Sequence, residues 1–239
     1  MLADRRAVTL ISTVTASDMS SFWHESLKGF ESNELDIPLA IIYSLESGRE
    51  HGQSLGPTTC IFQAALGISK DHPSVPKRTD LEQSNEGFIP LFRKARAAGG
   101  PVVLQKTDGS LPEDLFRGIR WRGFGEPSTT VVILSLAAGQ EVLGFLLLGL
   151  NPRRAYDEDF ERFIQLLSRQ LTTSLTTAAL IEQARLNQAT LSRQLSIRTQ
   201  EVADGESRFK AMTELNPLGM FYISPAGEIL YANERCMIA

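Results

Sequence analysis

The C-terminal part of the sequence contains a long segment without proline, from Arg153 to Asn216. Within it, mostly apolar side chains recur every seven residues. A proline-free segment with a seven-residue repeat favours a long helix whose apolar stripe supercoils around a second helix. The positions of the repeat are Phe160, Leu167, Ser174, Ile181, Gln188, Leu195, Val202 and Phe209, with a companion stripe at Ile164, Leu171 and Ala178.

We therefore predict a helix that begins near Asp157 and joins two copies of the chain in a homodimer. Its first half has a stripe wide enough to pack on a sheet and on a partner. Its second half has a thin seam and contains Gly205, so we expect it to be marginally stable. A dimeric signal transmitter and a solvated spacer helix both fit this pattern. The residues predicted for the dimer and signalling function are Phe160, Ile164, Leu167, Leu171, Ala178, Ile181, Leu195, Val202 and Phe209.

A second apolar run, residues 131–150, is long enough to cross a bilayer. Gln140 and Glu141 lie at its middle, where a carboxylate is costly in a membrane, and Gly139 beside them favours a turn. The run therefore predicts two buried strands, residues 130–136 and 142–149, joined as a hairpin. We expect no membrane segment.

The remaining patterns predict a mixed fold. Strands are expected at residues 37–45, 58–66 and 101–104, and helices at 4–14, 18–30 and 88–98. The polar segment 69–86 and the segment 106–127 are expected to be loops. This order of elements indicates an α+β fold, with an antiparallel sheet and helices packed on a face.

Composition and charge exclude several classes of function. The net charge is −4, which argues against a nucleic-acid partner because phosphate contacts need a basic surface. The two cysteines, Cys60 and Cys236, cannot build a disulfide framework, and the three histidines show no metal-ligand spacing. The charged N-terminal residues do not fit a signal peptide, so the chain is expected to be cytoplasmic.

The segment 130–179 resembles the last strands and closing helix of a GAF domain, most of all those of bacterial and fungal hybrid histidine kinases. Residues 37–43 resemble the first strand of that domain, and residues 91–103 its central helix and following strand. The resemblance implies a GAF domain over residues 1–184, followed by a signalling-helix linker at 185–205. The matching positions are Gly144, Gly149, Leu150, Asn151, Pro152, Arg153, Arg154, Asp157, Asp159, Phe163 and Gln170.

Residues 206–233 are similar to the opening of a PAS domain. The resemblance implies an incomplete PAS domain over residues 206–239, with a hairpin at 220–223 and 228–232. The part of a PAS domain that binds haem or flavin follows this opening, so no cofactor residue is implied. The matching features are Arg208-Phe209, Pro217-Leu218-Gly219, Phe221, Gly227 and Tyr231-Ala232-Asn233.

The order GAF, helix, PAS implies the non-catalytic sensory input region of a multidomain signalling protein. The usual output is a histidine kinase with a receiver, in a two-component phosphorelay, and neither module is expected in this sequence. The alternatives are an input region of a cyclic-di-nucleotide enzyme or a transcription regulator, and a truncated decoy that pairs with a full-length kinase. A methionine sulfoxide reductase is disfavoured because Cys60 is the one cysteine in the predicted GAF region.

Five aromatic residues near the predicted loops are candidates for a small-molecule pocket. They line a ligand site or cap an empty core that holds no ligand, and the residues alone leave both interpretations open. No cofactor is evident, and the sequence lacks the Asn-Lys-Phe-Asp-Glu string of cyclic-nucleotide-binding GAF domains. The five candidates are Phe88, Phe92, Phe116, Trp121 and Phe124.

Overall fold

The computed structural model describes residues 18–50 and 53–237, with side chains at 18–46 and 58–236. The expected helix at residues 4–14 lies outside the described residues. The chain divides into two compact units, residues 1–183 and 184–239, and helix α4 contributes to both. Each unit is described below by itself.

The first unit is built on a six-stranded antiparallel sheet with the strand order β3-β2-β1-β6-β5-β4. The central strands β1 and β6 pair from Leu39 with Gly149 to Ser44 with Gly144. The strands are β1 (Leu39–Glu50), β2 (Gln53–Leu66), β3 (Arg78–Asp80), β4 (Val102–Gln105), β5 (Thr130–Ala138) and β6 (Glu141–Gly149). This architecture confirms the predicted α+β fold class.

The long apolar run forms the β5–β6 hairpin, as predicted, with its turn at Gly139 in the left-handed region (φ +65°). Its strands are apolar on both sides because both faces of the sheet are covered. Leu146 and Leu148 face one core, whereas Phe145 and Leu147 face the other. No helix within the described parts of the chain is long and apolar enough to cross a membrane.

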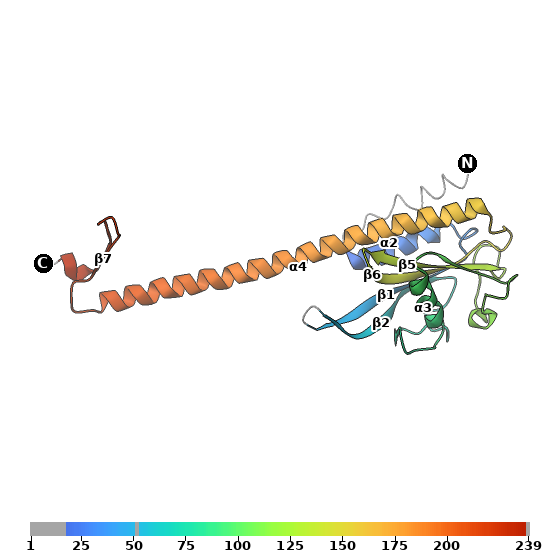
Figure 1. Ribbon diagram of the computed structural model, residues 1–239, viewed down its shortest axis with the longest axis horizontal. Coiled ribbons are helices and arrows are strands. Elements are labelled where there is room, and N and C mark those ends of the chain that lie inside the picture. Colours follow the sequence, from blue (N-terminus) through green and yellow to red (C-terminus); the bar gives the residue numbers. More distant parts are fainter. Residues whose placement is uncertain (1–17, 51–52, 238–239) are drawn as a thin grey trace. The chain divides into compact units, whose positions relative to one another are not determined.

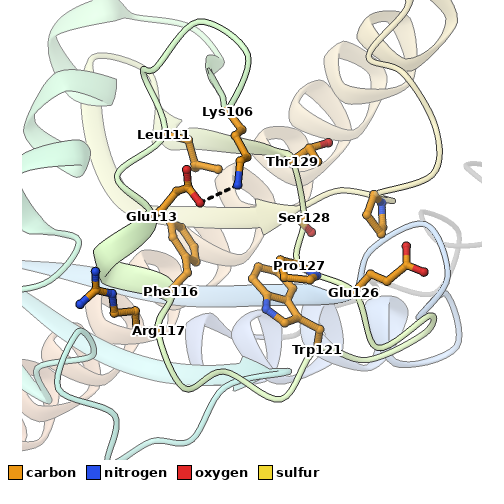
Figure 2. Close-up of a pocket in the computed structure, with 11 residues that line it drawn as sticks. Lys106, Leu111, Glu113, Phe116, Arg117, Trp121, Glu126, Pro127, Ser128 and Thr129 are labelled. Atoms are coloured by element: carbon orange, nitrogen blue, oxygen red, sulfur yellow. Dashed lines mark hydrogen bonds and ion pairs between the residues drawn. The ribbon is translucent and has the colours of Figure 1, made fainter.

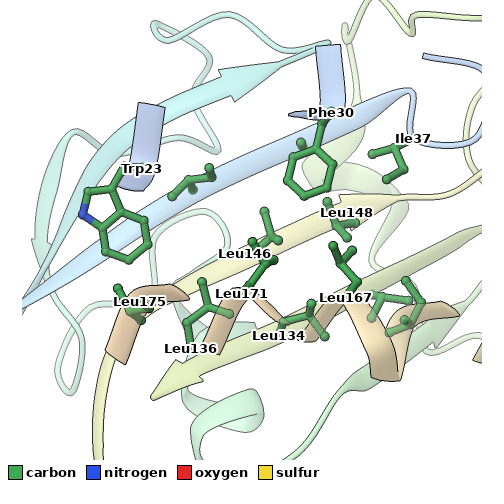
Figure 3. Close-up of a cluster of buried hydrophobic side chains, with 14 of the residues drawn as sticks. Trp23, Phe30, Ile37, Leu134, Leu136, Leu146, Leu148, Leu167, Leu171 and Leu175 are labelled. Atoms are coloured by element: carbon green, nitrogen blue, oxygen red, sulfur yellow. The ribbon is translucent and has the colours of Figure 1, made fainter. Parts of the chain in front are cut away.

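One face of the sheet is covered by α2 (Met19–Glu31) and the first part of α4 (Glu158–Glu214) (Figure 1). The Asp18 carboxylate caps α2 by accepting a hydrogen bond from the Ser21 amide at 2.7 Å. Trp23 and Phe30 of α2 meet strand side chains such as Leu146 in this core, which Figure 3 shows.

The other face is covered by α3 (Ile89–Ala98) and the irregular segment that follows β4. Gly99 ends α3 with a left-handed conformation (φ +65°), as expected for a C-terminal glycine cap. A short 3-10 helix, η1 (Glu113–Phe116), lies in the segment expected to be a loop. The predicted packing of helices on a face is thus present, and the second face is covered as well, because strands that are apolar on both sides need two covering layers.

Helix α4 is 57 residues long and carries all the residues of the predicted seam. In the first unit its buried stripe packs on the sheet of the same chain. The exposed fraction of these side chains is at most 3%, so in this fold they do not form a surface for a second copy. They are Phe160, Ile164, Leu167, Leu171, Leu175 and Ala178. Ile181 is half-buried, whereas Leu195, Val202 and Phe209 are exposed.

The second unit consists of the C-terminal half of α4, a hairpin of β7 (Phe221–Ile223) and β8 (Ile229–Ala232), and η2 (Glu234–Met237). Asn233 is fully buried and joins the helix end to the hairpin. Its amide nitrogen donates to the carbonyl oxygens of Thr213 at 2.8 Å and Leu218 at 3.1 Å. Its side-chain oxygen accepts from the Met220 amide at 2.9 Å.

Candidate functional site

A cleft of about 590 Å³ opens in the first unit beside the end of β4 and the start of β5 (Figure 2). This volume lies within the usual range for small-molecule sites. The cleft combines apolar walls with charged groups. It is lined by Lys106, Leu111, Glu113, Phe116, Arg117, Trp121, Glu126, Pro127, Ser128, Thr129 and Pro152.

Two of the predicted aromatic residues, Phe116 and Trp121, line this cleft. Their ring centroids are 6.0 Å apart and their planes differ by 26°, so the rings are stacked. Phe116 is held from behind by Phe88, at a centroid distance of 5.3 Å. The Phe116 ring is therefore held in place by packing on Phe88, whereas Trp121 is half-buried and accessible from the cleft.

A buried hydroxyl lies among these apolar groups. Ser128 is 4% exposed, and its Oγ atom has no hydrogen-bond partner among the described residues. Ser128 Oγ and Trp121 both pack against the backbone of Gly149, where there is no side chain. A Cβ atom added at Gly149 would lie 2.9 Å from Ser128 Oγ and 3.1 Å from Trp121 Cζ3, so the two groups are close to each other. An unpaired buried hydroxyl is costly, so a partner of suitable chemistry would be favoured here.

The charged groups of the cleft form ion pairs. Lys106 Nζ lies 2.8 Å from Glu113 Oε2, and Arg117 pairs with Asp114 at 2.7 Å. Glu126 accepts hydrogen bonds from the guanidinium of Arg153, which lowers the pKa of the Glu126 carboxyl. These pairs are solvent-exposed, so each contributes little to stability.

The cleft is bounded by the segment that leads into α4. Pro152 lines it, and the neighbouring Arg153 lies over the Phe124 ring with its guanidinium carbon 4.2 Å from the centroid. Asn151 is tied to Asp36 through its backbone amide, at 3.0 Å. The Asp157 carboxylate then accepts from the Phe160 amide at 2.8 Å and caps the first turn of α4. The cleft and the start of α4 are thus five residues apart in sequence, Pro152 to Asp157.

The other sequence candidates lie elsewhere. Phe88 and Phe92 are fully buried in the core between the sheet and α3, which we call the second core cluster. There Phe92 stacks on Phe145 with 4.9 Å between the ring centroids. Phe124 packs under Arg153 outside the cleft lining. The sequence analysis did not select Ser128 as a candidate, and it named Pro152 only as a match to GAF domains, not as a residue of the cleft.

A second cavity of about 360 Å³ lies against the loop after β2 and the segment 118–120. His72 joins these two segments, since its Nε2 atom is 2.8 Å from the Arg117 carbonyl and its Nδ1 atom accepts from the Ser74 amide at 3.2 Å. Ser74 Oγ donates to the Leu115 carbonyl at 2.8 Å. These hydrogen bonds give His72 a role in loop packing.

Cys60 lies within the second core cluster and is fully buried. Burial raises the pKa of its thiol to about 12, so the thiol stays protonated at neutral pH and is a poor nucleophile. Among residues 18–50 and 53–237, no three His, Cys, Asp or Glu side chains gather in a group that could hold a metal ion.

No protein-family model matches the sequence, and no curated protein matches it. Several solved structures are similar to it. Residues 122 to 287 of a methyl-accepting chemotaxis protein are 15% identical, with a TM-score of 0.49, over 72% of this chain and 98% of that one. The GAF domain of an Acinetobacter phosphoenolpyruvate-protein phosphotransferase is 14% identical, with a TM-score of 0.46, over 77% and 98%.

A third similar structure is an enzyme. It is the free methionine-R-sulfoxide reductase of Neisseria meningitidis in complex with its substrate, which is 14% identical with a TM-score of 0.45, over 75% of this chain and 91% of that one. These likenesses identify no ligand and no activity for this chain.

Proposed function

We propose that this chain is a non-catalytic, GAF-type sensory input region that relays ligand binding through a dimeric helix. The observation that carries the proposal is the position of Pro152, which lines the cleft and lies five residues before the cap of α4, Asp157. A ligand in the cleft would favour one arrangement of the segment 151–157. Any difference in affinity between two arrangements then shifts the population of helix states.

The part of α4 that follows Ala178 carries a stripe suited to a second copy of the chain. At about 100° per residue, five exposed apolar side chains fall within an arc of ~60°. Arg198 falls within this arc and Gly205 lies about 20° beyond its edge, which favours a weak pairing that small energies can shift. The five are Leu180, Leu191, Leu195, Val202 and Phe209, with exposed fractions of 65%, 59%, 67%, 61% and 40%.

The dimer is tested by sedimentation of the full chain at several concentrations. We expect Leu195→Glu to abolish a concentration-dependent dimer, because a carboxylate would be buried in the seam. Leu186→Glu is the matched control, since Leu186 is 57% exposed and lies about half a turn out of phase with Leu195. A monomeric wild type, or equal behaviour of the two variants, overturns the relay.

The wider context is part of the same proposal. The resemblance to hybrid histidine kinases favours a cytoplasmic, two-component phosphorelay setting in which kinase and receiver modules act downstream. A cyclic-di-nucleotide enzyme, a transcription regulator and a decoy paired with a kinase would use the same input region. The protonated, buried Cys60 thiol supports a sensory function over thiol chemistry of the reductase type.

A further inference from the structure

The cleft presents no unbalanced charge to a ligand. Its two cations, Lys106 and Arg117, are balanced by its two carboxylates, Glu113 and Glu126. Lys106 and Glu113 neutralise each other directly at 2.8 Å, as the dashed line in Figure 2 marks. Sites that select charged ligands instead place an excess of opposite charge around them. The cleft therefore favours a ligand without a net charge.

The walls are suited to a flat ring. Trp121 and Phe116 present stacked rings, and Leu111, Pro127 and Pro152 add rigid apolar surface. Aromatic faces select other rings by offset stacking, in addition to the burial of apolar area. The volume of about 590 Å³ leaves room for one or two rings.

A single polar group is buried in the lining without a partner, the Ser128 hydroxyl. Figure 2 shows Ser128 and Trp121 in the lining, and both side chains lie close to Gly149. A hydroxyl both donates and accepts, so one polar substituent on a ring stacked at Trp121 could satisfy it.

We propose that the cleft binds an uncharged, planar aromatic compound with one hydrogen-bonding substituent, stacked on Trp121 and bonded to Ser128. This inference rests on the proposed function and names the ligand class of the same site. It makes Ser128 a specificity residue, because a ring without the polar substituent would leave the buried hydroxyl unpaired.

The test uses four small probes of similar size and the full chain. They are p-cresol, toluene, 4-methylcyclohexanol and the p-toluate anion. Binding is followed by the two tryptophan indole N–H signals in ¹H–¹⁵N spectra, assigned with Trp121→Phe. We expect p-cresol to bind most tightly and to shift the Trp121 signal. The Trp23 signal should stay fixed, because Trp23 belongs to the other core cluster.

Ser128→Ala supplies the decisive comparison. It should weaken p-cresol binding roughly three- to tenfold, the effect of one lost hydrogen bond, and leave toluene binding unchanged or stronger. Ser26→Ala is the matched control, because Ser26 Oγ is also buried and has no partner in the described part of the chain, but it lies in α2. The variant should bind like the wild type.

Three results would overturn the inference. Tighter binding of p-toluate would show a charge-selective site, and equal binding of 4-methylcyclohexanol would show that a planar ring is not selected. Absence of any Trp121 shift up to the solubility limits would show that the cleft does not take this class. None of these results bears on the Leu195→Glu dimer test, which decides the relay by itself.

Discussion

At the scale of single residues, Gly144 shows how the absence of a side chain positions a helix. Gly144 lies in β6 and pairs with Ser44 of β1. Trp23 of α2 occupies the space above it, since an added Cβ would lie 2.6 Å from Trp23 Cη2 and 2.5 Å from the Tyr43 carbonyl oxygen. The indole thus packs directly on the backbone of a central strand, which fixes where α2 lies on the sheet.

We expect Gly144→Ala to destabilise the first unit by ~1–3 kcal/mol, because the methyl group forces the strand and Trp23 apart. Urea unfolding followed by tryptophan fluorescence measures this change in the free energy of unfolding. Gly100→Ala is the control, since nothing lies within 4 Å of its added Cβ, and it should change stability by less than ~0.5 kcal/mol. Equal effects of both substitutions would contradict the packing of Trp23 on Gly144.

At the scale of elements, α4 shows what a sequence pattern can and cannot predict. The heptad pattern correctly predicted a long helix, but it placed Ser174 in the stripe and missed Leu175. A straight helix repeats every 3.6 residues, so over five turns its buried side runs from Phe160 to Ala178 through Leu175. The repeat of seven drifts off that side, and packing on a sheet does not impose the supercoil that would correct the drift.

We expect Leu171→Ala to cost ~2–5 kcal/mol of unfolding free energy, because Leu171 is 3% exposed in the core between α4 and the sheet. Leu166→Ala removes the same atoms from the same helix at a side chain that is 45% exposed. That control should change stability by less than ~0.5 kcal/mol. Chemical denaturation of both variants gives the comparison, and similar losses would show that the buried stripe is wrongly placed.

Strands and sites differ in how much of them the sequence determines locally. The β5–β6 hairpin could be predicted because two short apolar runs flank a glycine turn. Strand β3 could not be predicted, since it has only three residues and forms by pairing with β2, for example Asp80 with Thr59. The cleft is less predictable still, because Trp121 and Ser128 lie between β4 and β5 whereas Pro152 follows β6, and these two segments meet only after the sheet forms.

At the scale of the whole molecule, the two units differ in what holds them together. The first unit has two large apolar clusters. The second buries Thr213 and Asn233 and leaves apolar side chains of its hairpin exposed, including Phe221 and Ile229. Apolar burial is the main source of stability, so the first unit should unfold cooperatively while the hairpin depends on hydrogen bonds.

Asn233 is then the residue on which the hairpin depends most. Asn233→Ala removes the acceptor for the Met220 amide and the donor to Thr213 and Leu218, and it leaves buried groups unpaired. We expect hydrogen exchange across residues 220–232 to accelerate at least ~tenfold, with the first unit unchanged. Glu234→Ala changes an exposed neighbour and should leave exchange unaltered. Unchanged exchange in Asn233→Ala would mean that strand pairing alone holds the hairpin. Slower folding or weaker protection of the first unit would mean that the stability of one unit depends on the other.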